Sequence, residues 1–191
     1  MRGIALSLGL IVLAACSPPS QPAASTATSA APETTIPASV EPVTPEGYRG
    51  VRIGMTLRQA ETVLGQAIQP DGNDEDSEAC VTFHIGEGDP RTEASFMAEN
   101  GHVTRVSFYG PAPPSRTPEG VGVGSSDAQV RAAYAGRVIE QPAKYDDPPA
   151  HDLIVWTTPQ TAGYRFEVGQ DGKVNALHAG GPSILYVEGC A

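Results

Sequence analysis

The sequence is poor in basic residues, in cysteine and in long hydrophobic runs. Only 12 of its 191 residues are Lys or Arg, against 22 Asp or Glu, so the formal net charge is −10. Nucleic-acid binding needs a basic surface that neutralises phosphates, and an acidic chain gains nothing by charge at an anionic membrane surface. We therefore expect no nucleic-acid partner. The length is typical of one domain or of two small ones.

The longest apolar run follows Arg2 and is too short for a permanent membrane-spanning helix. It ends in Leu13-Ala14-Ala15-Cys16. A basic start, a short apolar core and small residues before a cleavage point are typical of a secretory signal peptide, here residues 1–15. An ordinary secreted protein with a cysteine at this point by chance is the alternative to the lipoprotein described next.

The residues Leu13 to Cys16 resemble the lipobox of bacterial lipoproteins. The resemblance implies that Cys16 carries a diacylglycerol and, once it is the mature N-terminus, a further acyl chain such as palmitate. The membrane is then a partner through this lipid anchor. Ser17, rather than Asp, follows the cysteine. By resemblance to Gram-negative lipoproteins, this implies a location at the periplasmic face of the outer membrane.

A segment of low complexity follows the expected cleavage site. Residues 16–45 are mostly Pro, Ser, Ala and Thr and contain no Lys, Arg or aromatic residue. Such a segment cannot bury enough apolar surface to offset the entropy of ordering. We expect a disordered tether that holds the folded part, residues 46–191, away from the membrane.

The folded part contains two stretches that resemble each other, about 70 residues apart. Each has a glycine-rich turn of the form G-V-x-[IV]-G before a short helical pattern. Thr56 and Gln59 in the first, and Ser126 and Gln129 in the second, have the spacing of a capping box. We expect the two helices to end at Gly65 and Gly136, because glycine commonly terminates a helix.

Strand-like patterns follow each predicted helix. An Asn100-Gly101 pair between alternating segments indicates a hairpin, and Asp171-Gly172 indicates a second one. The expected strands are residues 81–85, 94–98, 103–109, 153–157, 164–168, 174–179 and 184–188. We therefore expect an α+β fold of two tandem repeats, residues 46–115 and 116–191. Each repeat is a short helix packed on an antiparallel sheet of about three to four strands.

These helical openings, Ile53-Gly54-Met55-Thr56 with Gln59 and Val123-Gly124-Ser125-Ser126 with Gln129, resemble the superfamily of the beta-lactamase inhibitor protein and the outer-membrane lipoprotein BamE. The resemblance covers about a third of the folded part. It implies a non-catalytic domain that binds an envelope protein partner or scaffolds an envelope complex. The second stretch departs from the pattern, because Ser125 stands where the family has Met.

Two cysteines remain once Cys16 is assigned to the lipid. An exported protein with an even number of cysteines favours a disulfide, here Cys80–Cys190. The closed loop would stabilise the fold by on the order of 4–5 kcal/mol in the chain-entropy model. Two free buried thiols are the alternative.

The sequence gives little support for a metal ion, a cofactor or a reaction. Cys80 and His84 lie four residues apart on an expected strand, roughly 13 Å, which is too far for a shared zinc ion. Residues 71–78 begin like a calcium loop, with Asp71 at its first position, but lack its glycine and final glutamate. Loose calcium binding there stays open. No nucleophile stands out beside the four histidines, which are His84, His102, His151 and His178.

The aromatic residues Trp156, Tyr164 and Phe166 fall on expected strands and are most simply core residues. If one sheet face is open, they would instead be contact residues. We therefore predict a lipid-anchored envelope protein that is not an enzyme. The alternatives are a module that binds a cell-wall glycan or small ligand, and a hydrolase with an unrecognised site.

Overall fold

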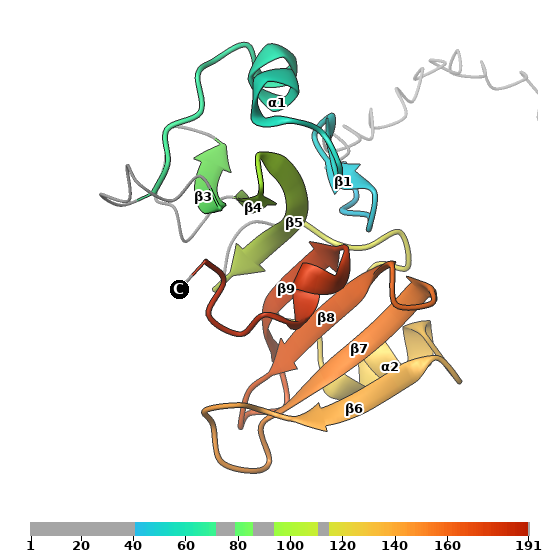
Figure 1. Ribbon diagram of the computed structural model, residues 1–191. Coiled ribbons are helices and arrows are strands. Elements are labelled where there is room, and N and C mark those ends of the chain that lie inside the picture. The colour runs from blue at the N-terminus through green and yellow to red at the C-terminus, as the bar shows by residue number, and fades with distance from the viewer. Residues whose placement is uncertain (1–40, 72–78, 86–93, 111–114, 191) are drawn as a thin grey trace, which may run out of the picture. The chain divides into compact units, whose positions relative to one another are not determined.

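The computed structural model describes residues 41–71, 79–85, 94–110 and 115–190 (Figure 1). These residues belong to one structural unit, Ala38–Ala191. The signal peptide, Cys16, most of the predicted tether and positions 72–78 of the calcium-like loop lie outside the described residues. No helix among the described residues is long and apolar enough to cross a membrane.

The fold is α+β, as predicted from the sequence. The described residues form two α-helices, one seven-stranded antiparallel sheet in the order β3-β4-β5-β9-β8-β7-β6, and a two-stranded sheet, β1-β2. In chain order the elements are β1 (Gly47–Tyr48), β2 (Val51–Arg52), α1 (Leu57–Leu64), β3 (Cys80–Ile85), β4 (Ala94–Glu99), β5 (His102–Tyr109), α2 (Asp127–Ala133), β6 (Val138–Pro142), β7 (His151–Thr158), β8 (Ala162–Val168), β9 (Val174–Gly180) and the 3-10 helix η2 (Pro182–Leu185).

Both helices begin with the predicted capping boxes. In α1 the Thr56 hydroxyl accepts from the Gln59 amide, and the Gln59 side chain accepts from the Thr56 amide. Ser126 and Gln129 repeat this arrangement in α2. Gly65 ends α1 in the left-handed conformation, at φ 69°, where a glycine is favoured because it has no Cβ.

One face of the large sheet is apolar and carries the helices. Side chains adjacent in the strand register form a buried row across six strands: Phe83, Phe96, Val106, Ala179, Tyr164 and Val155. Ala60 of α1 and Val130 of α2 belong to the same core. In Figure 1, α2 lies behind β6 and β7. The opposite face of the sheet is therefore without a helix from α1 or α2.

The segments before the two helices make matching backbone hydrogen bonds. Gly54 donates to the Val103 carbonyl over 2.7 Å, and Gly124 donates to the Val174 carbonyl over 2.8 Å. Val103 donates back to Met55, as Val174 donates back to Ser125, each over 2.8 Å. Each helix start is thereby fixed to the strand that follows the corresponding hairpin turn.

Three predicted boundaries are corrected. Val43 is fully buried and its amide donates to the Arg116 carbonyl, so the folded part begins before residue 45. Residues 184–188 do not form a strand, because the chain turns into η2 at Pro182–Leu185 and residues 186–188 pair with no strand of the sheet. Helix α2 ends at Ala133, and its C-cap residue is Tyr134 rather than the predicted Gly136.

The predicted disulfide is present. Cys80 at the start of β3 is bonded to Cys190, with the two Cα atoms 5.4 Å apart. The cross-link ties the end of the chain to an edge strand of the sheet. Cys80 is therefore not available as a zinc ligand or as a nucleophile.

Candidate functional site

The second face of the seven-stranded sheet carries a row of polar side chains. Because side chains alternate between the faces of a strand, each residue between two core residues points to this face. The strand register places neighbours side by side across five strands in the order His84, Ser95, Ser107, His178 and Arg165. A polar row at the centre of a sheet is costly unless every group finds a partner.

The end of the chain covers the middle of this row. We call residues 181–190 the C-terminal strap. Its helical turn η2 packs on β5, β8 and β9, with Ser183 and Ile184 buried. The Gly181 amide and the Ser183 hydroxyl both donate to the Thr104 carbonyl. In Figure 1 the strap runs in front of the sheet to the chain end marked C.

Two buried arginines hold the strap by its backbone. Arg105 Nη1 donates to the carbonyl oxygens of Ser183 and Tyr186, over 3.0 and 2.9 Å. Arg165 Nη1 donates to the carbonyl oxygens of Ile184 and Tyr186, each over 3.3 Å. The strap forms no strand, so its carbonyl oxygens have no backbone partners in the sheet. The two guanidinium groups supply charged hydrogen-bond donors instead.

Carboxylates neutralise one of these arginines. Arg165 Nε lies 3.0 Å from Asp152, and its Nη2 lies 2.8 Å from Glu167. Burial raises the pKa of Asp152, and the charge of Arg165 opposes that rise. Burial also raises the pKa of Glu167, but the hydrogen bond and charge of His178, with the arginines, outweigh it and lower the pKa overall.

Ser107, His178 and Glu167 form a hydrogen-bonded chain. The Ser107 hydroxyl lies 2.8 Å from His178 Nδ1, and His178 Nε2 lies 3.0 Å from Glu167. Burial lowers the pKa of His178, assisted by the charges of the two arginines. A neutral ring would accept from Ser107 and donate to Glu167. This order of groups occurs in hydrolases, but Ser107 and His178 are both 2 % exposed and line neither pocket described next.

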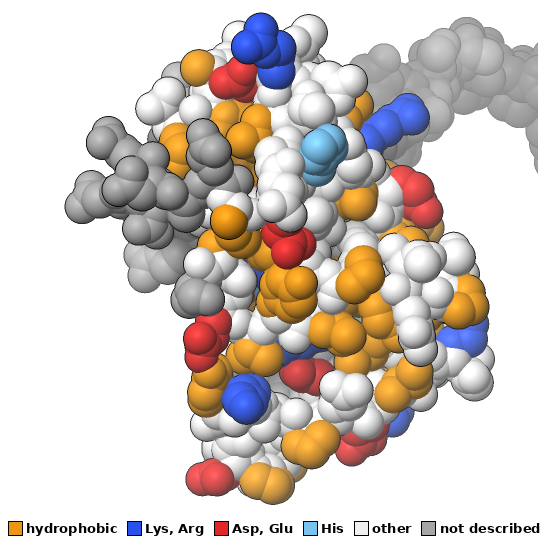
Figure 2. Space-filling view, in the orientation of Figure 1, with side chains coloured by type: hydrophobic (Ala, Val, Ile, Leu, Met, Phe, Trp, Pro, Cys, Tyr) orange, Lys and Arg blue, Asp and Glu red, His pale blue; other side chains and the backbone are white. Residues whose placement is uncertain are grey.

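Two pockets lie on this face, on either side of the strap. The larger, of about 500 Å³, is bounded by β3, β5 and the strap, and its lining includes His84, Ser95, Arg105 and Tyr109. The smaller, of about 170 Å³, includes Lys144, Asp152, Arg165 and Glu167. Val187 lines both pockets and so separates them. Figure 2 views this face and shows hydrophobic side chains along its middle, with a hollow that contains charged side chains.

The outer surface of the strap is apolar. Leu185, Tyr186 and Val187 are 42 %, 46 % and 41 % exposed, and Tyr145 in the loop before β7 is 67 % exposed. The Tyr145 hydroxyl donates to the Glu188 carboxylate, which joins that loop to the strap. We call these four exposed side chains the strap patch. The strap that carries three of these side chains is held by the disulfide and by the two arginines.

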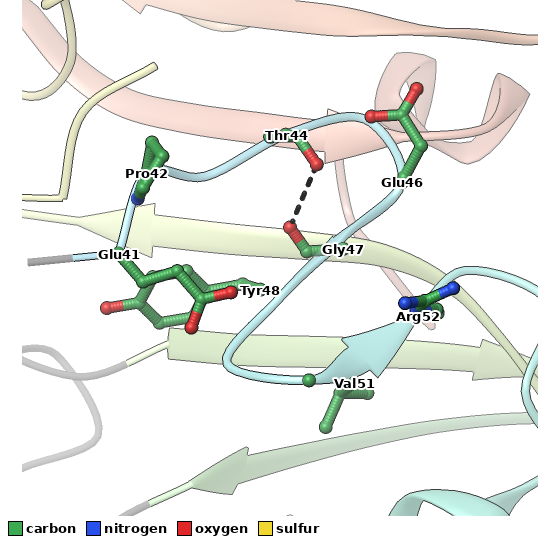
Figure 3. Close-up of a pocket in the computed structure, with 9 residues that line it drawn as sticks. Glu41, Pro42, Thr44, Glu46, Gly47, Tyr48, Val51 and Arg52 are labelled. Carbon is green, nitrogen blue, oxygen red and sulfur yellow. Dashed lines mark hydrogen bonds between the residues drawn. The ribbon is translucent and has the colours of Figure 1, made fainter. Parts of the chain in front are cut away.

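A further pocket, of about 410 Å³, lies at the β1-β2 hairpin (Figure 3). Its side chains include Glu41, Glu46, Tyr48 and Arg52, and the Thr44 hydroxyl donates to the Gly47 carbonyl. In Figure 3 the two glutamates lie well apart, and no group of reactive side chains converges there. The polar face under the strap is therefore the stronger candidate site.

The histidines considered in the sequence are dispersed. His84 lies 2.6 Å from Asp71, and both line the larger pocket. His102 contacts the Asn100 carbonyl at a turn, and His151 contacts Asp127 of α2. Within the part of the chain that the structure describes, only His178 joins a serine and an acid. Among the described residues no group of three His, Cys, Asp or Glu side chains is placed to hold a metal ion.

Sequence reasoning missed the arginines and acids of the polar face. Arg105 and Ser107 alternate with Val106 and Phe108, which was a sign that they share the second face. Their partners on β8 and β9 depend on the pairing of β5 with β9, which no local pattern shows. Comparison with known proteins finds no family model, no curated protein and no solved structure that matches this chain significantly.

Proposed function

We propose that this protein is a lipid-anchored bacterial envelope protein whose folded domain binds another envelope protein without catalysing a reaction. The residues Leu13 to Cys16 support the anchor through their resemblance to a lipobox. The composition of residues 16–45, which are mostly Pro, Ser, Ala and Thr, supports a spacer between the anchor and the folded domain. The domain would act at the periplasmic face of the outer membrane.

We also propose that the domain consists of two tandem repeats. The matching bonds of Gly54 and Gly124 to the strands after the hairpins, and the matching capping boxes, support this. In the sheet order β3-β4-β5-β9-β8-β7-β6 the strands of each half run outward from the central pair, β5 and β9. This arrangement is in keeping with the resemblance to the superfamily of the beta-lactamase inhibitor protein and BamE.

The observation that carries the binding function is the strap patch. Exposed apolar side chains that gather on a fixed backbone, beside polar groups, are typical of protein interaction surfaces. Tyrosine is enriched at such sites because it buries a large apolar area and keeps a hydroxyl for hydrogen bonding. The two tyrosines of the patch, Tyr145 and Tyr186, meet this description.

Glycan binding has less support. A sugar site normally offers aromatic rings for stacking, but each pocket on the polar face has a single tyrosine in its lining, Tyr109 in the larger and Tyr145 in the smaller. A hydrolase would need a substrate path to Ser107, which is buried under the present arrangement of the strap. Protein binding therefore fits the described surface best.

In-cell photo-cross-linking tests the proposal. A photoreactive amino acid at position 186 should capture one or a few defined envelope proteins in intact cells, identified by mass spectrometry. The same amino acid at Arg58, which is exposed on α1 on the other side of the sheet, is the control. Capture of the same proteins from both positions, or of none from position 186, would contradict an interface at the strap patch.

A further inference from the structure

Arg105 and Arg165 are equally buried on the polar face, but they differ in how far carboxylates neutralise their charges. Each is 3 % exposed, and each uses Nη1 to hold carbonyl oxygens of the strap. Arg165 has two carboxylate partners, Asp152 and Glu167. Arg105 has no ion pair with a carboxylate within the described part of the chain, and its buried Nε has no hydrogen-bond partner there.

A buried guanidinium without a counter-charge is strongly unfavourable. Backbone carbonyls solvate only one corner of Arg105, at Nη1. Burial lowers the pKa of Arg105, in agreement with incomplete compensation of its charge. Arg165, on the same face of the sheet, has two carboxylate partners within the fold. The missing counter-charge at Arg105 therefore points to a ligand.

Arg105 lines the larger pocket of about 500 Å³. Its Nη2 lies beside Gly189, where a side-chain Cβ would come within 3.2 Å of it, and Gly189 lines the same pocket. Of the three N–H donors that remain, Nε–H and one Nη2–H form one edge of the guanidinium. That edge matches the two oxygens of a carboxylate in a bidentate pair.

The other charged groups of the pocket limit the charge of the ligand. Asp71 and Glu188 both line it, but Asp71 is paired with His84, and Glu188 accepts a hydrogen bond from Tyr145. One uncompensated arginine beside two acids favours a monoanion over a phosphate dianion. The hydroxyls of Thr82, Ser95 and Tyr109 could complete the hydrogen bonds of a small polar ligand.

We propose that this pocket is a carboxylate-binding site in which Arg105 holds the ligand through Nε–H and Nη2–H. The carboxylate belongs either to a small free organic acid or to the C-terminus of a protein or peptide. The pocket volume admits both. This site shares Val187 with the strap patch, but it depends on Arg105, which is not part of that patch, so each proposal can fail without the other.

Titration of the full chain by NMR tests the proposal directly, because the Arg105 Nε–H signal reports on its own hydrogen bonds. Acetate represents the small free acid, N-acetylglycine represents a peptide C-terminus, and N-acetylglycinamide is the neutral control. We expect a saturable shift with one or both acids, at a Kd on the order of 1–10 mM for ligands of so few atoms. Binding of N-acetylglycine at least several-fold tighter than acetate would identify a C-terminus as the source, and equal binding a free acid.

Two variants complete the experiment. Arg105→Lys keeps the positive charge but loses the bidentate edge, so binding should weaken at least tenfold. Arg131→Lys makes the same change at a partly exposed position on α2, away from the pocket, and should bind as the wild type does. If Arg105→Lys fails to fold, the wild-type titration decides alone. The proposal would be overturned if neither acid, at up to about 50 mM, shifts the Arg105 Nε–H signal. An equal shift with the neutral amide would also overturn it.

Discussion

Arg105 and Arg165 donate hydrogen bonds to one shared acceptor, the carbonyl oxygen of Tyr186, over 2.9 and 3.3 Å. They reach it from β5 and β8, which lie on either side of β9 in the sheet. The strap is therefore held at its middle by both halves of the domain. At its end it is held by the Cys80–Cys190 disulfide.

Removal of the Arg165 side-chain charge should be strongly destabilising. Arg165→Gln leaves the buried Asp152 and the half-buried Glu167 without their guanidinium partner. Removal of one partner of a buried ion pair typically costs about 3–5 kcal/mol. Arg131→Gln is the control, because it removes an arginine that also has two carboxylate partners but lies at the surface. An exposed pair contributes about 0–1 kcal/mol. Urea unfolding of both variants measures the difference, and equal losses would contradict a buried network at Arg165.

Loss of the disulfide should loosen the strap before the sheet. Cys190→Ser removes a cross-link worth about 2–5 kcal/mol, which corresponds to a decrease in Tm of about 5–20 °C for a chain of this size. Leu185 and Tyr186 should then become sites of limited chymotrypsin cleavage below the melting temperature. The oxidised wild type, resistant to cleavage there, is the control. Equal cleavage of both would mean that the disulfide does not secure the strap.

The contribution of His178 to stability should depend on pH. Because burial lowers its pKa in the folded state, the unfolded chain binds a proton more readily. Stability should therefore fall as the pH drops below about 6.5, the unperturbed pKa of histidine. The titratable and polar groups that face the His178 ring are Ser107, Tyr109, Glu167 and the two arginines, Arg105 and Arg165.

His178→Gln provides the test, since it removes this titration. Urea midpoints at pH 7.5 and 5.5 should differ less in the variant than in the wild type. His151 has a raised pKa and acts in the opposite sense, with a stability contribution that is lost as the pH rises. It is present in both proteins, so the comparison isolates His178. An undiminished difference in the variant would show that His178 does not titrate as its burial requires.

The sequence was informative where structure depends on neighbours along the chain. Capping boxes, the Asn100-Gly101 hairpin and the core strands obey local rules and are present as predicted. Strand β6 was missed because it is short, ends in proline and is mostly exposed, so its apolar residues do not alternate with polar ones. The sequence predicts a strand at residues 184–188 because this part of the strap is a short apolar run, as many strands are. Its carbonyl partners are the side chains of Arg105 and Arg165, which only the tertiary structure brings there.

The candidate site could not be predicted from local sequence patterns, for the same reason. Ser107 and His178 are 71 residues apart and meet because β5 pairs with β9 at the centre of the sheet. A shift of that pairing by one residue would exchange the polar and apolar faces of β5. The composition of each strand predicts that it has a polar face, but not which polar groups become neighbours.

The first half of the domain should not fold alone. In the full domain β5 pairs with β9 from Arg105↔Gly180 to Tyr109↔Ala176. Residues 41–115 expressed alone would expose this edge of β5 and the apolar side chains that face the second half. We expect no cooperative thermal transition for this fragment, whereas residues 41–191 should melt cooperatively. A fragment that melts in one sharp transition would contradict joint folding of the two halves.

Membrane attachment should depend on the thiol of Cys16. A lipoprotein is anchored by acyl chains, each buried CH₂ of which contributes about 0.8 kcal/mol, and a serine hydroxyl at the same place is not expected to receive them. Cys16→Ser should therefore leave the protein unprocessed or release it from the membrane fraction, as judged by fractionation and by the mass of the mature chain. Ser17→Asp is the matched control, because it leaves the cysteine intact and should change only the choice of membrane, from outer to inner. A Cys16→Ser protein that is still cleaved after Ala15 and stays tightly bound would show that the lipoprotein hypothesis is wrong, whatever the folded domain binds.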